Sequence, residues 1–198
     1  IRFLVSVCNA SVVLCTATQP LLDEVEPYMA LPITEDKKII RDVSRLFTEL
    51  KRVEVFDKTR VGGWPEEEIA ELAGAELELT GSVLIVVNTK ASARNLFKLL
   101  HSKYKDSVTV FHLSTSMCPA HRMDVLNNIR NKLGSRENQP LICISTQLIE
   151  AGVDIDFGSV IRYLAGLDSI AQAAGRCNRN GLRTVTGRVL IVNPQHEN

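Results

Sequence analysis

Apolar positions along this 198-residue chain follow two spacings, one typical of strands and one typical of helices. Continuous or alternating apolar runs followed by turn residues predict strands at residues 11–18, 52–57, 82–89, 107–115, 140–146, 159–165 and 188–194. Segments with helical spacing lie between them, at residues 65–72, 91–104, 120–133 and 170–178. Strands and helices that alternate this regularly predict an α/β fold, in which helices cover both faces of a parallel sheet.

The first predicted strand is separated from the others by a segment of different composition. Residues 19–38 carry Pro20, Pro27 and Pro32, many acidic side chains and little periodicity, which is typical of a linker. We therefore expect three parts: residues 1–20 with the first strand, a linker over residues 21–38, and a main domain over residues 39–198. Because the chain opens without methionine, in what resembles the tail of a helix, we expect a piece of a longer protein.

The composition is that of a globular protein, with 45% hydrophobic and 23% charged residues. No apolar run approaches the roughly 20 residues that a membrane span requires, so we expect no membrane partner. Five cysteines without a CxxC pair indicate a reduced, cytoplasmic setting and no zinc site. Residues 1–80 hold nine Lys/Arg against fifteen Asp/Glu, and residues 81–198 hold fourteen against eight, which favours a nucleotide or nucleic acid as partner of the second part.

Small hydroxyl and amide side chains follow four of the predicted strands. Ligands of a parallel sheet bind beyond the carboxyl ends of its strands, and these side chains are of a size suited to phosphate. The alternative is that they cap the following helices, because capping uses the same residue types. Four pairs together favour a phosphate-lined edge: Thr16 and Thr18, Asn88 and Thr89, Ser114 and Thr115, and Ser145 and Thr146.

The segment SIAQAAGRCNRNG, residues 169–181, places two arginines among small residues. A glycine inside a helix costs about 1 kcal/mol, so we expect something to approach the backbone closely at Gly175. Two guanidinium groups three residues apart suit a phosphate chain, and a solvated basic face is the alternative. On a helical wheel the apolar face packs on the sheet, and the opposite face presents Gln172, Gly175, Arg176 and Arg179.

Four short strings resemble helicase motifs in their expected order. QAAGRCNR at residues 172–179 resembles motif VI of superfamily-two helicases, and ISTQLIEAGVDIDF at 144–157 resembles motif V. TAT at 16–18 and VVNT at 86–89 resemble motifs III and IV. The longer strings VVLCTATQP, VVNTKASA, STQLIEAGVDIDF and AAGRCNRNG together resemble the CRISPR-associated helicase–nuclease of type I systems, over essentially the whole chain. The resemblance implies a three-layer RecA-like parallel sheet, the helicase C-terminal lobe, with the end of the first RecA-like lobe in residues 1–20.

In that family two RecA-like lobes clamp ATP and Mg²⁺ between them, and single-stranded DNA crosses both lobes. The resemblance implies that Arg179 is the arginine finger, a fixed charge that neutralises the transferring phosphoryl group. Arg176 and Gln172 would contact phosphate or organise the closed interface. Asp154 would reach the nucleotide sugar or hold the finger, and its pairing with Arg176 is the local alternative. The implied nucleotide-binding set is Asp154, Gly152 and Gly175.

The resemblance also implies a nucleic-acid track along the lobe. Hydroxyls and backbone amides on phosphate allow tracking without sequence preference. The implied contacts are Thr89, Ser114, Thr115, Ser145 and Thr146. Thr16 and Thr18 would couple the nucleotide state to lobe closure. Glu150 matches a motif V position, but its chemistry suggests no particular role.

Several parts of a complete helicase–nuclease are missing from the sequence. No glycine is followed by lysine, so the Gly-Lys-Ser/Thr phosphate loop is missing. LLDEVEP at residues 21–27 imitates a magnesium-binding acidic box, but it follows the TAT string instead of preceding it. No histidine is followed by aspartate, so the adjacent His-Asp ligands of the nuclease are missing too. We expect this chain alone to hold neither ATP nor Mg²⁺ and to hydrolyse negligible ATP.

The expected function is one half of a motor. The parent would be an ATP-dependent helicase of type I CRISPR interference that translocates on single-stranded DNA, and this chain would supply the arginine finger and half of the DNA track. Its expected partners are single-stranded DNA, the missing first lobe and nuclease domain, and a CRISPR surveillance complex. Two alternatives stay open: a lobe of another superfamily-two RNA or DNA-repair helicase, and a non-catalytic module whose arginine face binds a protein.

Overall fold

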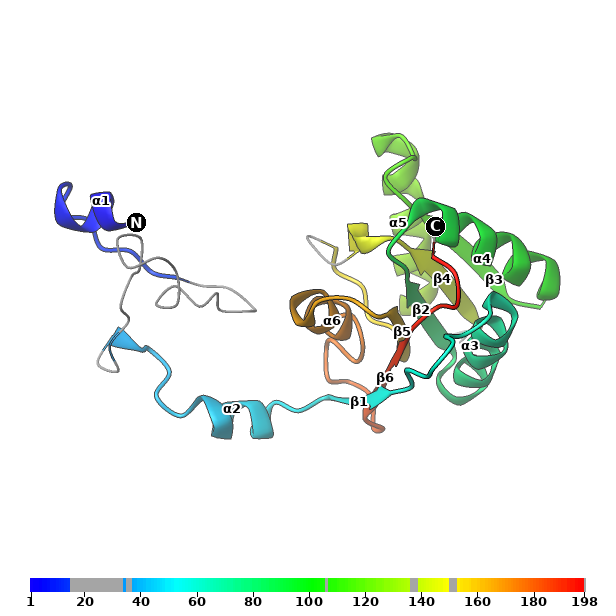
Figure 1. Ribbon diagram of the computed structural model, residues 1–198, viewed down its shortest axis with the longest axis horizontal. Coiled ribbons are helices and arrows are strands. Elements are labelled where there is room, and N and C mark those ends of the chain that lie inside the picture. The colour runs from blue at the N-terminus through cyan, green and yellow to red at the C-terminus, as the bar shows by residue number, and fades with distance from the viewer. Residues whose placement is uncertain (15–33, 35–36, 106, 136–138, 150–152, 198) are drawn as a thin grey trace. The chain divides into compact units, whose positions relative to one another are not determined.

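A computed structural model describes the chain except for residues 15–33, 35–36, 106, 136–138, 150–152 and 198 (Figure 1). The chain divides into two compact units, Ile1–Lys51 and Arg52–Asn198. The larger unit therefore begins at Arg52, whereas the composition placed the start of the main domain at residue 39.

In the described part of the first unit the chain forms two short helices, α1 (Arg2–Ser6) and α2 (Val43–Glu49). Helix α2 begins after Asp42, whose carboxylate accepts a hydrogen bond from the Arg45 N–H at 2.9 Å. Residues 11–14 of the first predicted strand adopt no strand structure. The rest of that strand, with Thr16 and Thr18, and most of the predicted linker lie outside the described residues.

The second unit is built on a six-stranded sheet in which every paired strand is parallel (Figure 1). The order across the sheet is β1-β6-β5-β2-β4-β3. Strands β2, β4 and β5 are buried along their whole length, which explains their continuous apolar sequences. The strands are β1 (Val53–Asp57), β2 (Ser82–Val86), β3 (Thr109–Leu113), β4 (Leu141–Ser145), β5 (Ser159–Tyr163) and β6 (Gly187–Val192).

Helices cover both faces of this sheet, so the predicted three-layer α/β fold is confirmed. Helices α3 (Glu66–Thr80) and α4 (Lys90–Lys103) share one apolar core with Val83 and Ile85. Helices α5 (Pro119–Gly134) and α6 (Leu167–Ala174) share the other core with Leu84 and Val86. The two cores take alternate residues of β2 because successive side chains of a strand point to opposite faces. No helix in the described part of the chain is long and apolar enough to cross a membrane.

Two helices end at residues that the helical pattern did not predict. Helix α3 continues eight residues beyond the expected end at Leu72 and stops at Gly81, which adopts the left-handed conformation at φ 75°. This longer helix brings Glu76, 3% exposed, against Arg188 of β6 at 3.0 Å. Helix α6 stops at Ala174 instead of residue 178, because the chain then turns to pair Cys177 with Phe157.

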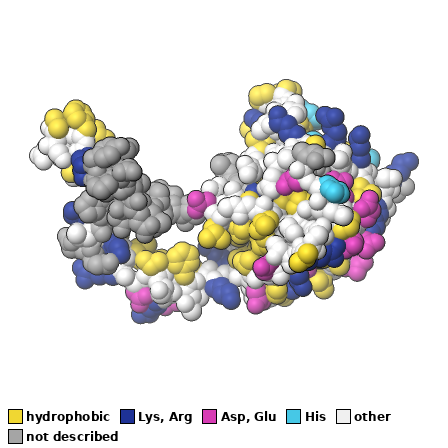
Figure 2. Space-filling view, in the orientation of Figure 1, with side chains coloured by type: hydrophobic (Ala, Val, Ile, Leu, Met, Phe, Trp, Pro, Cys, Tyr) yellow, Lys and Arg dark blue, Asp and Glu magenta, His cyan; other side chains and the backbone are white. Residues whose placement is uncertain are grey.

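The surface of the second unit mixes both signs of charge. On the face shown in Figure 2, several Lys and Arg side chains lie along the upper right of the second unit, and Asp and Glu side chains lie below them among further Lys and Arg side chains. The excess of basic residues after residue 80 therefore does not form one uniform basic patch on this face.

Candidate functional site

The end of the motif V string and the motif VI string lie against each other just before the amino end of β5. Phe157 and Cys177 form a parallel β-bridge. The Phe157 N–H donates to the Arg176 carbonyl at 2.9 Å, and the Asn178 N–H donates to the Phe157 carbonyl at 3.0 Å. Since Phe157 stands two residues before β5, this bridge lies opposite the carboxyl edge where the sequence pattern placed a phosphate site. The turn that carries Arg179 thus lies at the end of the sheet opposite the predicted hydroxyl-lined edge.

Buried and solvent-facing side chains alternate just before β5, so the carboxylates of Asp154 and Asp156 lie on the same side of the segment. Val153, Ile155 and Phe157 are buried, at 9%, 4% and 0% exposure. Asp154 is exposed and Asp156 is half-buried between them. Because side chains alternate along an extended segment, both aspartates point away from the core, toward the turn that follows α6.

Arg176 is buried and fastens two segments of the chain together. The residue is 6% exposed, and its Nε donates a hydrogen bond to the carbonyl of Ile149 at 2.8 Å. Ile149 belongs to the 3₁₀ helix η2 (Gln147–Ile149), which follows β4. In this arrangement Arg176 connects the motif V segment to the end of α6, and its guanidinium faces the protein interior.

Arg179 lies on the surface and is paired with an acid of its own lobe. Its Nε lies 2.9 Å from Asp154 Oδ1, and its Nη1 donates to the Gly175 carbonyl at 3.2 Å. The Arg179 side chain is 41% exposed and that of Asp154 is 78% exposed. Of the roles considered for Asp154, this contact matches holding Arg179, and Arg176 takes a different partner.

Asp156 contacts the same turn but was absent from the predicted site. Its Oδ1 accepts from the Arg179 backbone N–H at 2.8 Å, and its Oδ2 accepts from the Asn180 N–H at 3.1 Å. The alternation of the GVDIDF string would have identified it, because Asp154 and Asp156 stand two residues apart. Arg130 of α5 was also missed: its Nε donates to the Asp154 carbonyl at 3.2 Å, and no local pattern links it to this site.

Gly175 and Gln172 occupy the end of α6. A Cβ atom at Gly175 would lie 3.3 Å from the Gln172 carbonyl and 3.5 Å from the Ala171 carbonyl, both in its own helix. The glycine therefore ends α6, and no other segment of the described chain approaches it as closely as its own helix does. Gln172 is half-buried on α6. Gly152 and Glu150 lie outside the described residues.

The predicted nucleic-acid residues lie together at the carboxyl edge, after the adjacent strands β2, β4 and β3. Thr89 caps α4, because its hydroxyl accepts a hydrogen bond from the Ser92 N–H at 3.1 Å. Helix capping was the alternative to phosphate binding for this residue. Ser145 is fully buried, and its hydroxyl donates to the Thr146 carbonyl at 2.8 Å. Ser114 and Thr146 are 1% and 7% exposed, whereas Thr115 is exposed.

Asn88, which precedes Thr89, forms several hydrogen bonds at this edge. Its side-chain oxygen accepts from Arg162 Nη1 at 2.6 Å. Its backbone N–H and Nδ2 donate to the Glu197 carboxylate at 2.9 and 2.8 Å. The segment near Glu197 thus covers the carboxyl end of β2.

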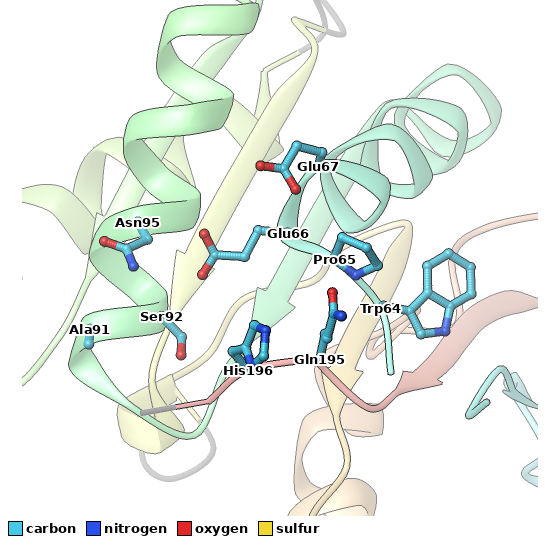
Figure 3. Close-up of a pocket in the computed structure, with 9 residues that line it drawn as sticks. All are labelled: Trp64, Pro65, Glu66, Glu67, Ala91, Ser92, Asn95, Gln195 and His196. Carbon is cyan, nitrogen blue, oxygen red and sulfur yellow. The ribbon is translucent and has the colours of Figure 1, made fainter. Parts of the chain in front are cut away.

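A pocket of about 310 Å³ opens beside this segment, between the first turns of α3 and α4. Figure 3 shows Glu66 extending from α3 toward Asn95 and Ser92 of α4, with Gln195 and His196 below it. Burial, and then the neighbouring Glu67, raise the pKa of Glu66, while a hydrogen bond with Asn95 opposes the shift. The pocket is separate from the arginine site at the amino ends of the strands.

Solved helicase structures share the fold of this chain. The crystal structure of Cas3 from T. fusca superposes with a TM-score of 0.64 and 20% identity, over 74% of this chain and 19% of that chain. The structure of the C-terminal domain of the DEAD-box protein Dbp5 superposes with a TM-score of 0.55 and 18% identity, over 72% of this chain and 77% of that chain. The fold, together with the motif V and VI segments that it brings into contact, defines the second RecA-like lobe of a superfamily-two helicase.

Sequence comparison identifies the particular family. A curated CRISPR-associated nuclease/helicase Cas3 from Methanothermobacter thermautotrophicus is 29% identical over 188 residues, which are 89% of this chain and 21% of that protein. Residues 80–182 match the family model described as CRISPR-associated nuclease/helicase Cas3, C-terminal. The chain belongs to this Cas3 family, as the motif strings predicted. It spans about a fifth of the length of that relative.

Proposed function

We propose that this chain is the second motor lobe of an ATP-driven helicase that moves on single-stranded DNA, and that Arg179 is its arginine finger. One observation carries the proposal: the Arg179 guanidinium lies at the surface, where it contacts the exposed Asp154 carboxylate and the Gly175 carbonyl of the same lobe. A permanently charged group in this position can reach a ligand that approaches from outside the lobe. Arg176, which faces the interior, cannot reach such a ligand without rearranging η2.

The Arg179–Asp154 pair is weak enough to exchange. Ion pairs between exposed side chains contribute about 0–1 kcal/mol, because water screens both charges. A triphosphate carries several negative charges and offers a guanidinium paired oxygens, so it competes well with one carboxylate. Asp154 would therefore hold the finger while the lobes are apart and release it when a nucleotide arrives.

This chain would supply the finger and leave most of nucleotide binding to another lobe. When ATP is bound, a finger neutralises the charge that develops on the transferring phosphoryl group. Mg²⁺ needs clustered oxygen ligands, and the described residues contain no group of three or more His, Cys, Asp or Glu side chains that could hold a metal ion. ATP and Mg²⁺ would accordingly be held by a first RecA-like lobe outside this chain.

The carboxyl edge would form this lobe's half of the DNA track. Thr89 and Thr115 are the members of the predicted set that reach solvent, and backbone groups of the same loops lie beside them. Such groups bind phosphate without reading sequence. Ser114, Ser145 and Thr146 are buried, so their hydroxyls would contact DNA only after a local rearrangement of this edge.

The whole protein would use this lobe in CRISPR interference. The family name describes a CRISPR-associated nuclease/helicase, and a chain of similar fold has been solved in a CRISPR RNA-guided surveillance complex before nicking. A surveillance complex would then deliver the DNA, the missing first lobe would bind ATP, and a nuclease domain would cut the strand.

The test is Arg179→Ala in the intact protein. Arginine fingers accelerate phosphoryl transfer by about 10³–10⁵-fold, so DNA-stimulated ATP hydrolysis should fall by at least about 10³-fold while the Kd for single-stranded DNA stays within about twofold. Arg94→Ala on α4, an exposed arginine on the opposite face of the sheet, is the matched control and should leave both values unchanged. If Arg179→Ala weakened DNA binding and spared hydrolysis, Arg179 would belong to the DNA track instead. The 198-residue chain by itself should hydrolyse no more ATP than buffer.

A further inference from the structure

The backbone of the turn that carries Arg179 is held by contacts that do not involve the Arg179 guanidinium. Asp156 accepts hydrogen bonds from two consecutive backbone N–H groups, those of Arg179 and Asn180, at 2.8 and 3.1 Å. Each carboxylate oxygen takes one of them. Hydrogen bonds in which the acceptor is ionised are roughly twice as strong as neutral ones. The carboxylate thus restrains the backbone of Arg179 and makes no described contact with its guanidinium.

The same turn is fixed on its other side by Asn178. This residue adopts a left-handed backbone at φ 44°, which is uncommon outside glycine, and it directly precedes the two N–H groups that donate to Asp156. Its buried side chain donates through Nδ2 to the Arg52 carbonyl at 3.1 Å. Arg52 in turn donates through Nη1 to the Arg179 carbonyl. The backbone of Arg179 is therefore bound on both its N–H and its C=O sides.

The two aspartates contact different parts of Arg179. Asp154 contacts the guanidinium and Asp156 contacts the backbone. If the guanidinium leaves Asp154 for a phosphate, nothing in that exchange disturbs the hydrogen bonds of Asp156. The Cα atom of Arg179 then stays in place while its side chain swings.

We propose that Asp156 is a positioning residue for ATP hydrolysis, which fixes the backbone from which the Arg179 finger extends. This inference rests on the proposed role of Arg179. A finger contributes to the rate only when its guanidinium meets the transition state in one geometry, because small misplacements of a catalytic group cost large factors in rate. Loosening the backbone should consequently lower kcat and leave the binding of ATP and DNA unchanged.

Asp156→Asn in the intact protein tests the proposal. Asparagine keeps the shape of the side chain but offers one acceptor oxygen in place of two, so one of the two N–H groups loses its partner. We expect kcat for DNA-stimulated ATP hydrolysis to fall about tenfold, with KM for ATP and Kd for DNA within about twofold. Asp168→Asn, an exposed aspartate in the first turn of α6, removes the same charge and should change none of these values.

Two further measurements separate positioning from general damage. Backbone amide exchange at residues 179 and 180 should be at least about tenfold faster in Asp156→Asn, with an unchanged melting temperature. When Arg179→Ala is present, Asp156→Asn should cause no further loss of kcat, because residues that act as a unit are not additive. An equal tenfold loss in that background, a normal kcat, or unchanged amide exchange would each overturn the proposal.

The same set of variants distinguishes this inference from the function on which it rests. If Arg179→Ala abolishes hydrolysis and Asp156→Asn does not alter kcat, the proposed role of Arg179 is supported and the proposed role of Asp156 is refuted. If Arg179→Ala leaves hydrolysis intact, the proposed function fails and the positioning role fails with it.

Discussion

The two arginines of the RCNR string should respond in opposite ways to substitution, and Arg176 gives the sharper prediction. Arg176→Ala removes a charge-assisted hydrogen bond, Nε to the Ile149 carbonyl at 2.8 Å. Ile149 is 1% exposed and Arg176 is 6% exposed, so water does not replace the lost donor. The substitution therefore separates η2 from the end of α6 and leaves a buried carbonyl without this partner.

The size of the effect follows from these contacts. Hydrogen bonds to charged groups contribute about 1.5–3 kcal/mol, and the truncated side chain also leaves a small cavity, so we expect a loss of roughly 2–4 kcal/mol. For a protein of this size 1 kcal/mol corresponds to about 2–4 °C, which gives a melting temperature roughly 4–16 °C lower. Arg179→Ala, which breaks an exposed ion pair, should cost less than about 1 kcal/mol.

Thermal unfolding of the 198-residue chain, followed by circular dichroism, is the assay. Wild type, Arg176→Ala and Arg179→Ala are compared in the same buffer. A melting temperature of Arg176→Ala within about 2 °C of wild type would refute the reasoning, since a buried charged connector cannot be removed at no cost. A large loss in Arg179→Ala would equally contradict the surface position that we assign to it.

Two further predictions concern the packing of the second unit. Gly158→Ala places a Cβ atom 2.6 Å from Thr80 Cβ and 2.7 Å from the Thr80 carbonyl, so the free energy of unfolding measured in urea should fall by at least about 2 kcal/mol. Gly134→Ala, which has open space around it, is the control and should leave the free energy of unfolding unchanged. Equal free energies of unfolding for the two variants would argue against this packing. Glu66 has a pKa raised above its unfolded value, so its destabilising effect is absent below the ordinary glutamate pKa and appears as the pH rises through the raised value. The gain in urea midpoint of Glu66→Gln over wild type should thus be larger at pH 7 than at pH 4, and a smaller gain at pH 7 would show the opposite shift.

Much of the fold could be predicted from local patterns. The buried strands β2, β4 and β5 have continuous apolar sequences because both of their faces are covered, and that signal needs no knowledge of the partners. Helix α4 was predicted within one residue at each end, because Thr89 provides a cap and the apolar residues that follow keep helical spacing. The predicted end of helix α6, residue 178, is four residues too late, because the pattern cannot register that Cys177 leaves the helix to pair with Phe157.

The candidate site was predicted unevenly for the same reason. The motif strings identified Arg179 and Asp154, which the structure brings to 2.9 Å from each other. They gave the two arginines different roles but placed both on the helix face that points away from the sheet, whereas Arg176 is buried. They also missed Asp156, whose role depends on the backbone of a turn 23 positions later.

By itself the sequence determined most elements of the second unit, the parallel α/β class and the helicase family, because these depend on local spacing and on short strings of residue types. The tertiary structure alone decided which arginine is buried, which aspartate holds a side chain and which holds a backbone, and which edge of the sheet each group occupies. Burial and hydrogen bonding are set by neighbours more than twenty positions away, such as Ile149 for Arg176 and Asp154 for Arg179. Those neighbours are brought into contact only when the strands take their places in the sheet.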